Sequence, residues 1–234
     1  MRKLISLLLI AAFGFVVLTS ATPKKKKSKM FKGTVTYSLN YEGDALTPLQ
    51  ISKLPKTVSI KMFGTMTSIE IVNGPAIITM IERPDDKVKI TLIEVMDKKA
   101  GMTEKDTTSS DGVDSTSQFT TEIEYSEDTK VIAGYKCKKA VVTFTPKDSV
   151  DAEEQTLIVF YSPEMGSAAL NEDGPYKGIP GLLMEFYKVE VGLNTKFAAT
   201  EVKKGGVKEL DFFFQSDYKE FKSGEELMKY LQGQ

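Results

Sequence analysis

The most constraining feature of this sequence is a two-residue alternation of apolar and polar side chains that recurs along most of the chain. In residues 57–63, for example, Val58, Ile60 and Met62 alternate with polar neighbours. Successive side chains of a β-strand point to opposite faces, so this pattern predicts strands with one buried and one solvated face. Alternation, or a short apolar run, predicts strands at 31–42, 57–63, 66–72, 76–82, 87–96, 118–126, 130–136, 139–145, 155–162, 182–191, 195–203 and 207–214.

Glycine-containing turns separate many of these segments, which favours antiparallel pairing. Two short helices are predicted beside the strands. One begins at Thr47 with Pro48 in its first turn and ends near Lys53. The other spans 223–232, where a serine cap precedes an apolar stripe. The sequence thus predicts a mainly β (α+β) fold, with one antiparallel domain over 31–234.

The N-terminus has the three parts of a secretory signal peptide. Arg2 and Lys3 precede an uncharged apolar run at 4–18, and small residues follow at 19–21. The run is about 15 residues, shorter than the ~20 that a membrane-spanning helix needs. We therefore expect cleavage after Ala21 and a periplasmic or secreted product, with 22–30 as a basic disordered linker. An uncleaved N-terminal anchor is the alternative.

Composition limits the chemistry that is available. The chain has no histidine and one cysteine, Cys137, which argues against His-based triads and His-ligated zinc. Removing Arg2 and Lys3 from 31 basic residues leaves 29 against 32 acidic ones, a net charge of −3 that does not suit a nucleic-acid binder. The polar stretch 97–117 is interpreted as an exposed loop or hairpin tip, and it lacks the spacing of a calcium-binding loop. We expect no cofactor, no metal and no catalytic activity.

Residues 163–181 form the most unusual segment, because proline and glycine recur between two apolar strands. Long loops of this composition are typical of lids and binding loops. The alternative is a structural bend: Gly178 and Gly181 permit it, Pro180 fixes it, and Ile179 and Leu182 enter the core.

The end of this segment resembles a known family. Gly178-Ile179-Pro180-Gly181-Leu182-Leu183 is similar to the signature of the GLPGLI family of exported proteins of Bacteroidota. The stretch 132–140 resembles a Gly-Tyr strand of that family and of the related DUF4412 proteins, and 160–165 and 55–61 are similar to further parts. The resemblance covers about 31–214. It implies a LolA-like fold, a strongly curved antiparallel sheet or half-barrel whose relatives carry lipid or lipoprotein acyl chains.

These observations predict an exported, non-catalytic periplasmic protein that binds a lipid, a lipoprotein acyl chain or another apolar ligand in a half-barrel cavity. The apolar runs and frequent methionines supply such a wall. The residues expected to form the lid or cavity are Tyr176, Ile179, Pro180, Gly181, Leu182, Met184, Met62 and Met80. An envelope protein-interaction or structural module without a small-molecule ligand is the alternative. A third hypothesis, paired catalytic carboxylates, would use Glu164, Glu172, Asp173 and Glu185.

Overall fold

The computed structural model describes residues 30–105, 119–147, 154–171, 174–190 and 192–233. The predicted signal peptide, most of the linker and the candidate acids Glu172 and Asp173 lie outside these ranges. Within them, no helix is long and apolar enough to cross a membrane.

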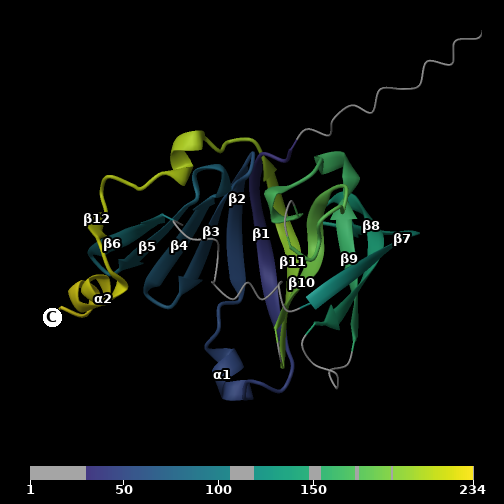
Figure 1. Ribbon diagram of the computed structural model, residues 1–234, viewed down its shortest axis with the longest axis horizontal. Coiled ribbons are helices and arrows are strands. Elements are labelled where there is room, and N and C mark those ends of the chain that lie inside the picture. The colour runs from purple at the N-terminus through teal and green to yellow at the C-terminus, as the bar shows by residue number, and fades with distance from the viewer. Residues whose placement is uncertain (1–29, 106–118, 148–153, 172–173, 191, 234) are drawn as a thin grey trace, which may run out of the picture.

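Twelve strands form one sheet among the described residues, in the order β12-β6-β5-β4-β3-β2-β1-β11-β10-β9-β8-β7 (Figure 1). All neighbours pair antiparallel except β6 and β12, which are parallel. The strands are β1 (Gly33–Glu42), β2 (Thr57–Phe63), β3 (Met66–Asn73), β4 (Ala76–Arg83), β5 (Val88–Val95), β6 (Lys98–Lys105), β7 (Phe119–Ile132), β8 (Tyr135–Pro146), β9 (Gln155–Ser162), β10 (Leu182–Glu190), β11 (Leu193–Lys204) and β12 (Lys219–Phe221).

The sheet is strongly curved and unclosed, with β7 and β12 at its two edges (Figure 1). This architecture is consistent with a half-barrel and confirms the predicted fold class. The first strand, β1, lies in the middle of the sheet beside β11. The two halves of the molecule are therefore joined through strands from opposite ends of the sequence.

Two α-helices and several 3₁₀ turns accompany the sheet in the described ranges. The helices are α1 (Pro48–Ser52) and α2 (Gly224–Gln232), and the turns are η1 (Pro84–Asp86), η3 (Pro163–Met165), η4 (Ala169–Asn171) and η5 (Glu209–Phe212). Thr47 caps α1 through a capping box with Gln50. Ser223 caps α2 by accepting a hydrogen bond from the Glu226 amide, 3.3 Å away. Helix α2 packs on β6, where Lys98 Nζ donates to the Tyr230 carbonyl oxygen at 2.8 Å.

The two halves of the sheet bury opposite faces. On the concave face, the fully buried side chains of Val35, Tyr37 and Met62 belong to the main core. Ile69 pairs with Met80 in the β3–β4 register, so Ile81 points to the other, convex face. There it joins a second core that the segment after β11 covers. The second core consists of Ile81, Ile90, Leu92, Val207 and Phe212. Strand β4 lies where the buried face changes from concave to convex, which explains why it is apolar on both faces.

Two expectations about elements are wrong. Residues 207–214 are not a strand. The Lys208 amide donates to the Asp211 carboxylate at the start of the 3₁₀ turn η5, and Val207, Phe212 and Phe214 pack in the second core. Residues 98–105 are not a loop but strand β6, whose small buried Ala100 and Gly101 hide the alternation. Strand β12 is only three residues long, which is too short for an alternation pattern to indicate it.

The segments predicted as separate strands at 118–126 and 130–136 are one long strand, β7, that ends at Ile132. Ala133 (φ 47°) and Gly134 (φ 83°) then form the turn into β8. The Gly-Tyr stretch that carries part of the family resemblance is therefore a hairpin turn. The rest of the polar stretch, 106–117, lies outside the described residues.

Candidate functional site

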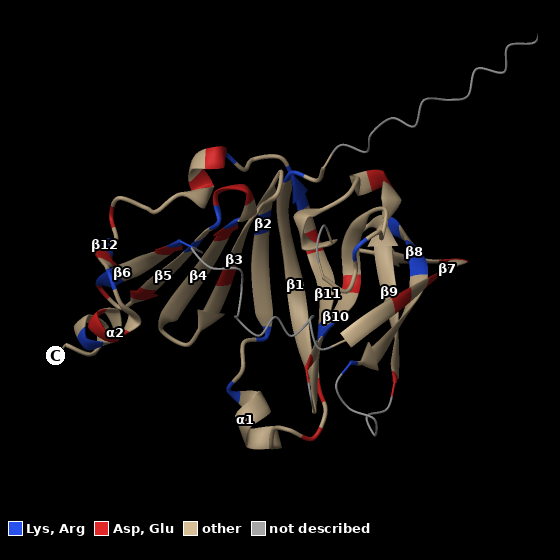
Figure 2. Cartoon of the chain, in the orientation of Figure 1, with Lys and Arg blue, Asp and Glu red and all other residues tan. Residues whose placement is uncertain are grey.

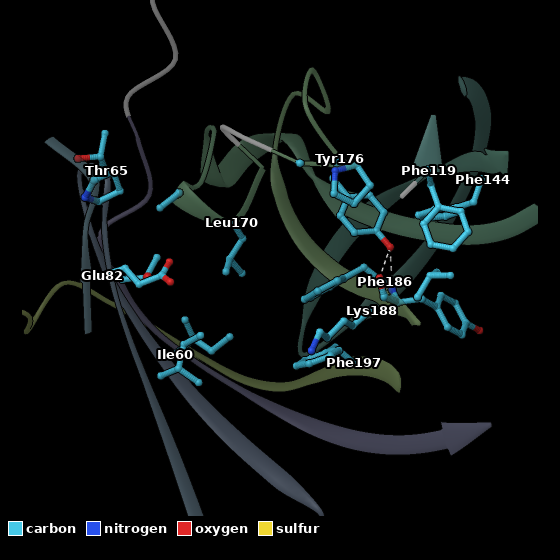
Figure 3. Close-up of a pocket in the computed structure, with 18 residues that line it drawn as sticks. Ile60, Thr65, Glu82, Phe119, Phe144, Leu170, Tyr176, Phe186, Lys188 and Phe197 are labelled. Carbon is cyan, nitrogen blue, oxygen red and sulfur yellow. Dashed lines mark hydrogen bonds between the residues drawn. The ribbon is translucent and has the colours of Figure 1, made fainter. Parts of the chain in front are cut away.

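A cavity of about 360 Å³ opens on the concave face of the sheet (Figure 3). Its floor contains Ile60 on β2 and Ile69 on β3, which belong to one half of the sheet. Its opposite wall comes from β7, β8, β10 and β11. Ala169 and Leu170 of η4 approach it from the 163–181 segment, and Leu170 lies between the two walls in Figure 3.

The wall on the β7–β11 side is aromatic. It consists of Phe119, Phe144, Tyr176, Phe186 and Phe197, a set that we call the aromatic wall. The rings of Phe186 and Phe197 are stacked, with centroids 4.8 Å apart, and Tyr176 meets Phe186 edge-to-face at 5.7 Å. Pairs of this geometry hold each other in place and add to apolar burial. The wall is therefore a pre-formed apolar surface.

The opposite side of the cavity is polar. Thr65 and Glu82 lie there, across the cavity from Tyr176, in Figure 3. Thr67 pairs with Glu82 in the β3–β4 register, so the two side chains share the concave face. Lys188 lies on the aromatic side, and its Nζ is 2.8 Å from Glu190 Oε1. The cavity thus has an aromatic end and a polar end.

Hydrogen bonds fasten the 163–181 segment to the sheet. Asn171 Nδ2 donates to the carbonyl oxygens of Ile179 (2.6 Å) and Gly181 (3.0 Å). Tyr125 on β7 donates from its hydroxyl to the Gly178 carbonyl oxygen at 3.0 Å. The Tyr176 hydroxyl accepts from the Tyr187 amide at 3.0 Å and donates to the carbonyl oxygen of the same residue.

Backbone contacts explain the glycines of this segment. Gly178 has φ +97°, which side chains disfavour. A Cβ at Gly181 would lie 2.5 Å from the Ser162 carbonyl oxygen. Only glycine fits such an approach without a shift of the backbone. Of the two interpretations of the segment, this geometry favours the structural bend over a movable lid.

The structure brings one of the eight residues predicted for the ligand site, Tyr176, to the cavity. The others lie elsewhere in the described chain. Pro180 is exposed, and Met80 is 38% exposed on the concave face without lining the cavity. The remaining five are buried: Met62, Ile179, Gly181, Leu182 and Met184. Their apolarity serves the core and the bend.

Sequence reasoning missed four phenylalanines of the aromatic wall and the polar pair Thr67 and Glu82. The phenylalanines occupy concave-face positions of strands, which period-two counting can assign to one face of each strand. That they converge depends on the order and curvature of the whole sheet, in which β7, β8, β10 and β11 lie on one side of β1 and β2 and β3 lie on the other (Figure 1). The place of Glu82 at the cavity follows from the β3–β4 register, which pairs it with Thr67.

The candidate catalytic acid Glu185 has both carboxylate oxygens in ion pairs. They lie 2.7 Å from Lys130 Nζ and 2.9 Å from Lys196 Nζ. Glu185 pairs with Ala198, whose neighbour Phe197 faces the cavity, so the carboxylate lies on the convex face. Burial raises the pKa of Glu185, but the two lysine hydrogen bonds outweigh it and hold this pKa below its ordinary value. The carboxylate is held as a structural anion.

Charges of both signs are interspersed over the strands and loops (Figure 2). Several are paired across strands, as Lys139 is with Asp128 at 3.1 Å. The only cysteine, Cys137, is buried, and burial raises the pKa of its thiol to about 11. A thiol with such a pKa is almost fully protonated at neutral pH and therefore a poor nucleophile.

No protein-family model and no curated protein matches this sequence. Membership of the GLPGLI family therefore stays a prediction that rests on the short motifs quoted above.

Proposed function

We propose that this chain is an exported, non-catalytic periplasmic protein that binds a lipid, a lipoprotein acyl chain or another apolar ligand in its concave cavity. The observation that carries the proposal is the aromatic wall facing a space of about 360 Å³. Small-molecule sites are mostly apolar clefts of roughly 300–1,000 Å³ with a few convergent polar groups. This cavity has that size and that composition.

Apolar burial supplies the binding free energy. Each buried methylene contributes about 0.8 kcal/mol, so a chain with about ten buried methylenes gains on the order of 8 kcal/mol. Loss of translational and rotational freedom offsets several kcal/mol of this gain. A single acyl chain is therefore expected to bind reversibly, in keeping with a carrier or sensor rather than a permanent lipid site.

Export is proposed from the sequence of residues 1–21. Expression of the full chain in a Gram-negative host, followed by fractionation and N-terminal sequencing, tests it. The expected product is periplasmic or secreted and begins at Thr22. Recovery of the chain in the membrane fraction with its first residues intact would support the uncleaved anchor instead.

A cavity-filling substitution tests ligand binding. Leu170 projects towards the cavity in Figure 3, so Leu170→Trp should fill it. We expect this variant to bind the neutral fluorescent probe N-phenyl-1-naphthylamine at least about tenfold more weakly than the unaltered protein. The matched control is Leu49→Trp on α1, where the side chain is 69% exposed and outside the cavity lining. Equal loss in both variants, or unchanged binding in Leu170→Trp, would contradict the proposal.

One observation favours the alternative, an envelope protein-interaction module. Strand β7 is 14 residues long and lies at an edge of the sheet, and no strand of the described residues pairs with the outer side of its backbone, where a partner's strand could add. Val131 on this strand is 71% exposed. A photo-crosslinker at Val131 should capture a defined envelope protein in cells if this function is real, whereas one at Leu49 should not.

A further inference from the structure

The polar residues of the cavity indicate which polar group its ligand has. Glu82 and Lys188 are the charged residues among those that line the cavity. The Lys188 ammonium is compensated by Glu190 at 2.8 Å. The Glu82 carboxylate has, within the described residues, a single ion-pair contact, with Lys89 Nζ at 3.9 Å. A contact of that length between two exposed side chains is weak. The cavity therefore offers an available carboxylate rather than an available cation.

Thr67 provides an independent observation at the same place. It lines the cavity beside Glu82 and is only 7% exposed. Its hydroxyl makes no hydrogen bond to any other part of the described chain, unlike that of Thr65, which donates to Asp85 Oδ2 at 2.9 Å. Because Thr67 lines the cavity, its hydroxyl can donate to or accept from a ligand bound there. A carboxylate and a free hydroxyl thus face the same end of an apolar cavity.

We propose that the ligand is an amphiphile whose apolar part lies on the aromatic wall and whose polar end is a hydrogen-bond donor, foremost a protonated amine, held by Glu82 and Thr67. An ammonium group donates to the carboxylate and to the hydroxyl oxygen. A fatty-acid carboxylate would meet the like charge of Glu82, and the one cation among the described residues that line the cavity, Lys188, is already paired with Glu190. This inference rests on the proposed function, since it concerns the same cavity.

Three ten-carbon probes that differ only in their polar end test the proposal: decylamine, 1-decanol and decanoate. Each is titrated at pH 7 and low salt, below its aggregation concentration, against the mature protein loaded with N-phenyl-1-naphthylamine. We expect decylamine to displace the probe at a concentration about tenfold lower than decanoate, with 1-decanol between them, because each exposed charge changes affinity by roughly threefold. Decanoate binding as tightly as decylamine would overturn the proposal.

Variants assign the preference to the named residues. Glu82→Gln should bring decylamine and decanoate within about twofold of each other and should change 1-decanol binding less than it changes decylamine binding. Thr67→Val should weaken 1-decanol by about threefold. The matched control is Glu70→Gln, because Glu70 lies on the other face of β3 and does not line the cavity. If the ratio of the decylamine and decanoate affinities is unchanged in Glu82→Gln, the inference is overturned. Binding of the ten-carbon probes in that variant would still support the proposed function. Failure of all three probes to bind would overturn both.

Discussion

The buried hydroxyl of Tyr37 on β1 donates a hydrogen bond to the carbonyl oxygen of Leu183 on β10, 2.8 Å away, across the intervening strand β11. The Tyr37 ring also meets Phe186 of the aromatic wall edge-to-face, with centroids 5.5 Å apart. One side chain therefore links the centre of the sheet to the start of the strand that follows the 163–181 segment. Its burial raises the pKa of the phenol far above the ordinary value, so the donor is present at any physiological pH.

Loss of this hydrogen bond should destabilise the protein. Tyr37→Phe keeps the ring and leaves a buried carbonyl oxygen without this donor, which costs about 1–3 kcal/mol. Urea denaturation followed by circular dichroism measures the change. Tyr230→Phe is the control, because the Tyr230 hydroxyl has no hydrogen bond within the described chain. Equal stability of the two variants would show that the Tyr37 hydroxyl does not contribute.

Two glycines of the bend should differ in their tolerance of a methyl group. Gly181→Ala places a Cβ against the Ser162 carbonyl oxygen and forces a backbone shift, which costs about 1–3 kcal/mol or more. Gly178→Ala meets open space and suffers only the strain of its positive φ, about 1–2 kcal/mol. Thermal unfolding of both variants gives the order. If the Gly181→Ala variant is more stable than the Gly178→Ala variant, the close approach of Gly181 to the Ser162 carbonyl oxygen is contradicted.

The ion pairs of Glu185 make stability depend on pH. The folded-state pKa of this carboxyl is held below its ordinary value, so its contribution is fully present above the unfolded-state pKa and is lost as the pH falls through the folded-state pKa. The window lies at acidic pH, from about 4.5 downwards. We expect Glu185→Gln to lose about 1–2 kcal/mol at pH 7 and less at pH 3. Glu190→Gln, which alters the more exposed pair with Lys188, should change stability by under about 1 kcal/mol at either pH.

The second core on the convex face should stabilise the fold without touching the ligand site. Phe212 is completely buried there against Ile81 and Leu92. Phe212→Ala removes a large buried ring and should cost about 3–5 kcal/mol. Leu210→Ala, two residues earlier and 73% exposed, should be nearly neutral. Under conditions where both variants remain folded, both should bind the fluorescent probe like the unaltered protein, because neither residue lines the cavity.

Local patterns were sufficient to predict the fold class. Val58, Ile60 and Met62 alternate as the sequence suggested, and all three are buried on one face of β2. The errors came where local chemistry competes with periodicity. Residues 207–214 alternate like a strand, yet Glu209–Phe212 form a 3₁₀ turn in which the Lys208 amide donates to Asp211 Oδ2 at 2.7 Å. In β6 the buried residues are Ala100 and Gly101, which are too small to mark an apolar position in the sequence pattern.

The site was harder to predict than the fold, for a topological reason. Ile60 and Phe197 face the same cavity although 137 residues separate them, and their meeting requires the pairing of β1 with both β2 and β11. Strand register across such distances is not encoded in any short window of sequence. The methionines and the Pro-Gly motif are locally unusual, whereas the four phenylalanines of the aromatic wall are common residues at ordinary strand positions.

The central position of β1 has a consequence for how the chain folds. Gly33 pairs with Lys204, so the first strand cannot complete its hydrogen bonding until almost the last strand is available. Contacts of such high sequence separation slow folding, because a long loop must be closed before they form. The β2–β5 meander can form early from local hairpins, while the cavity closes late, once β11 docks between β1 and β10. The apolar cavity therefore forms only when nearly the whole described chain, from β1 to β11, is available for pairing.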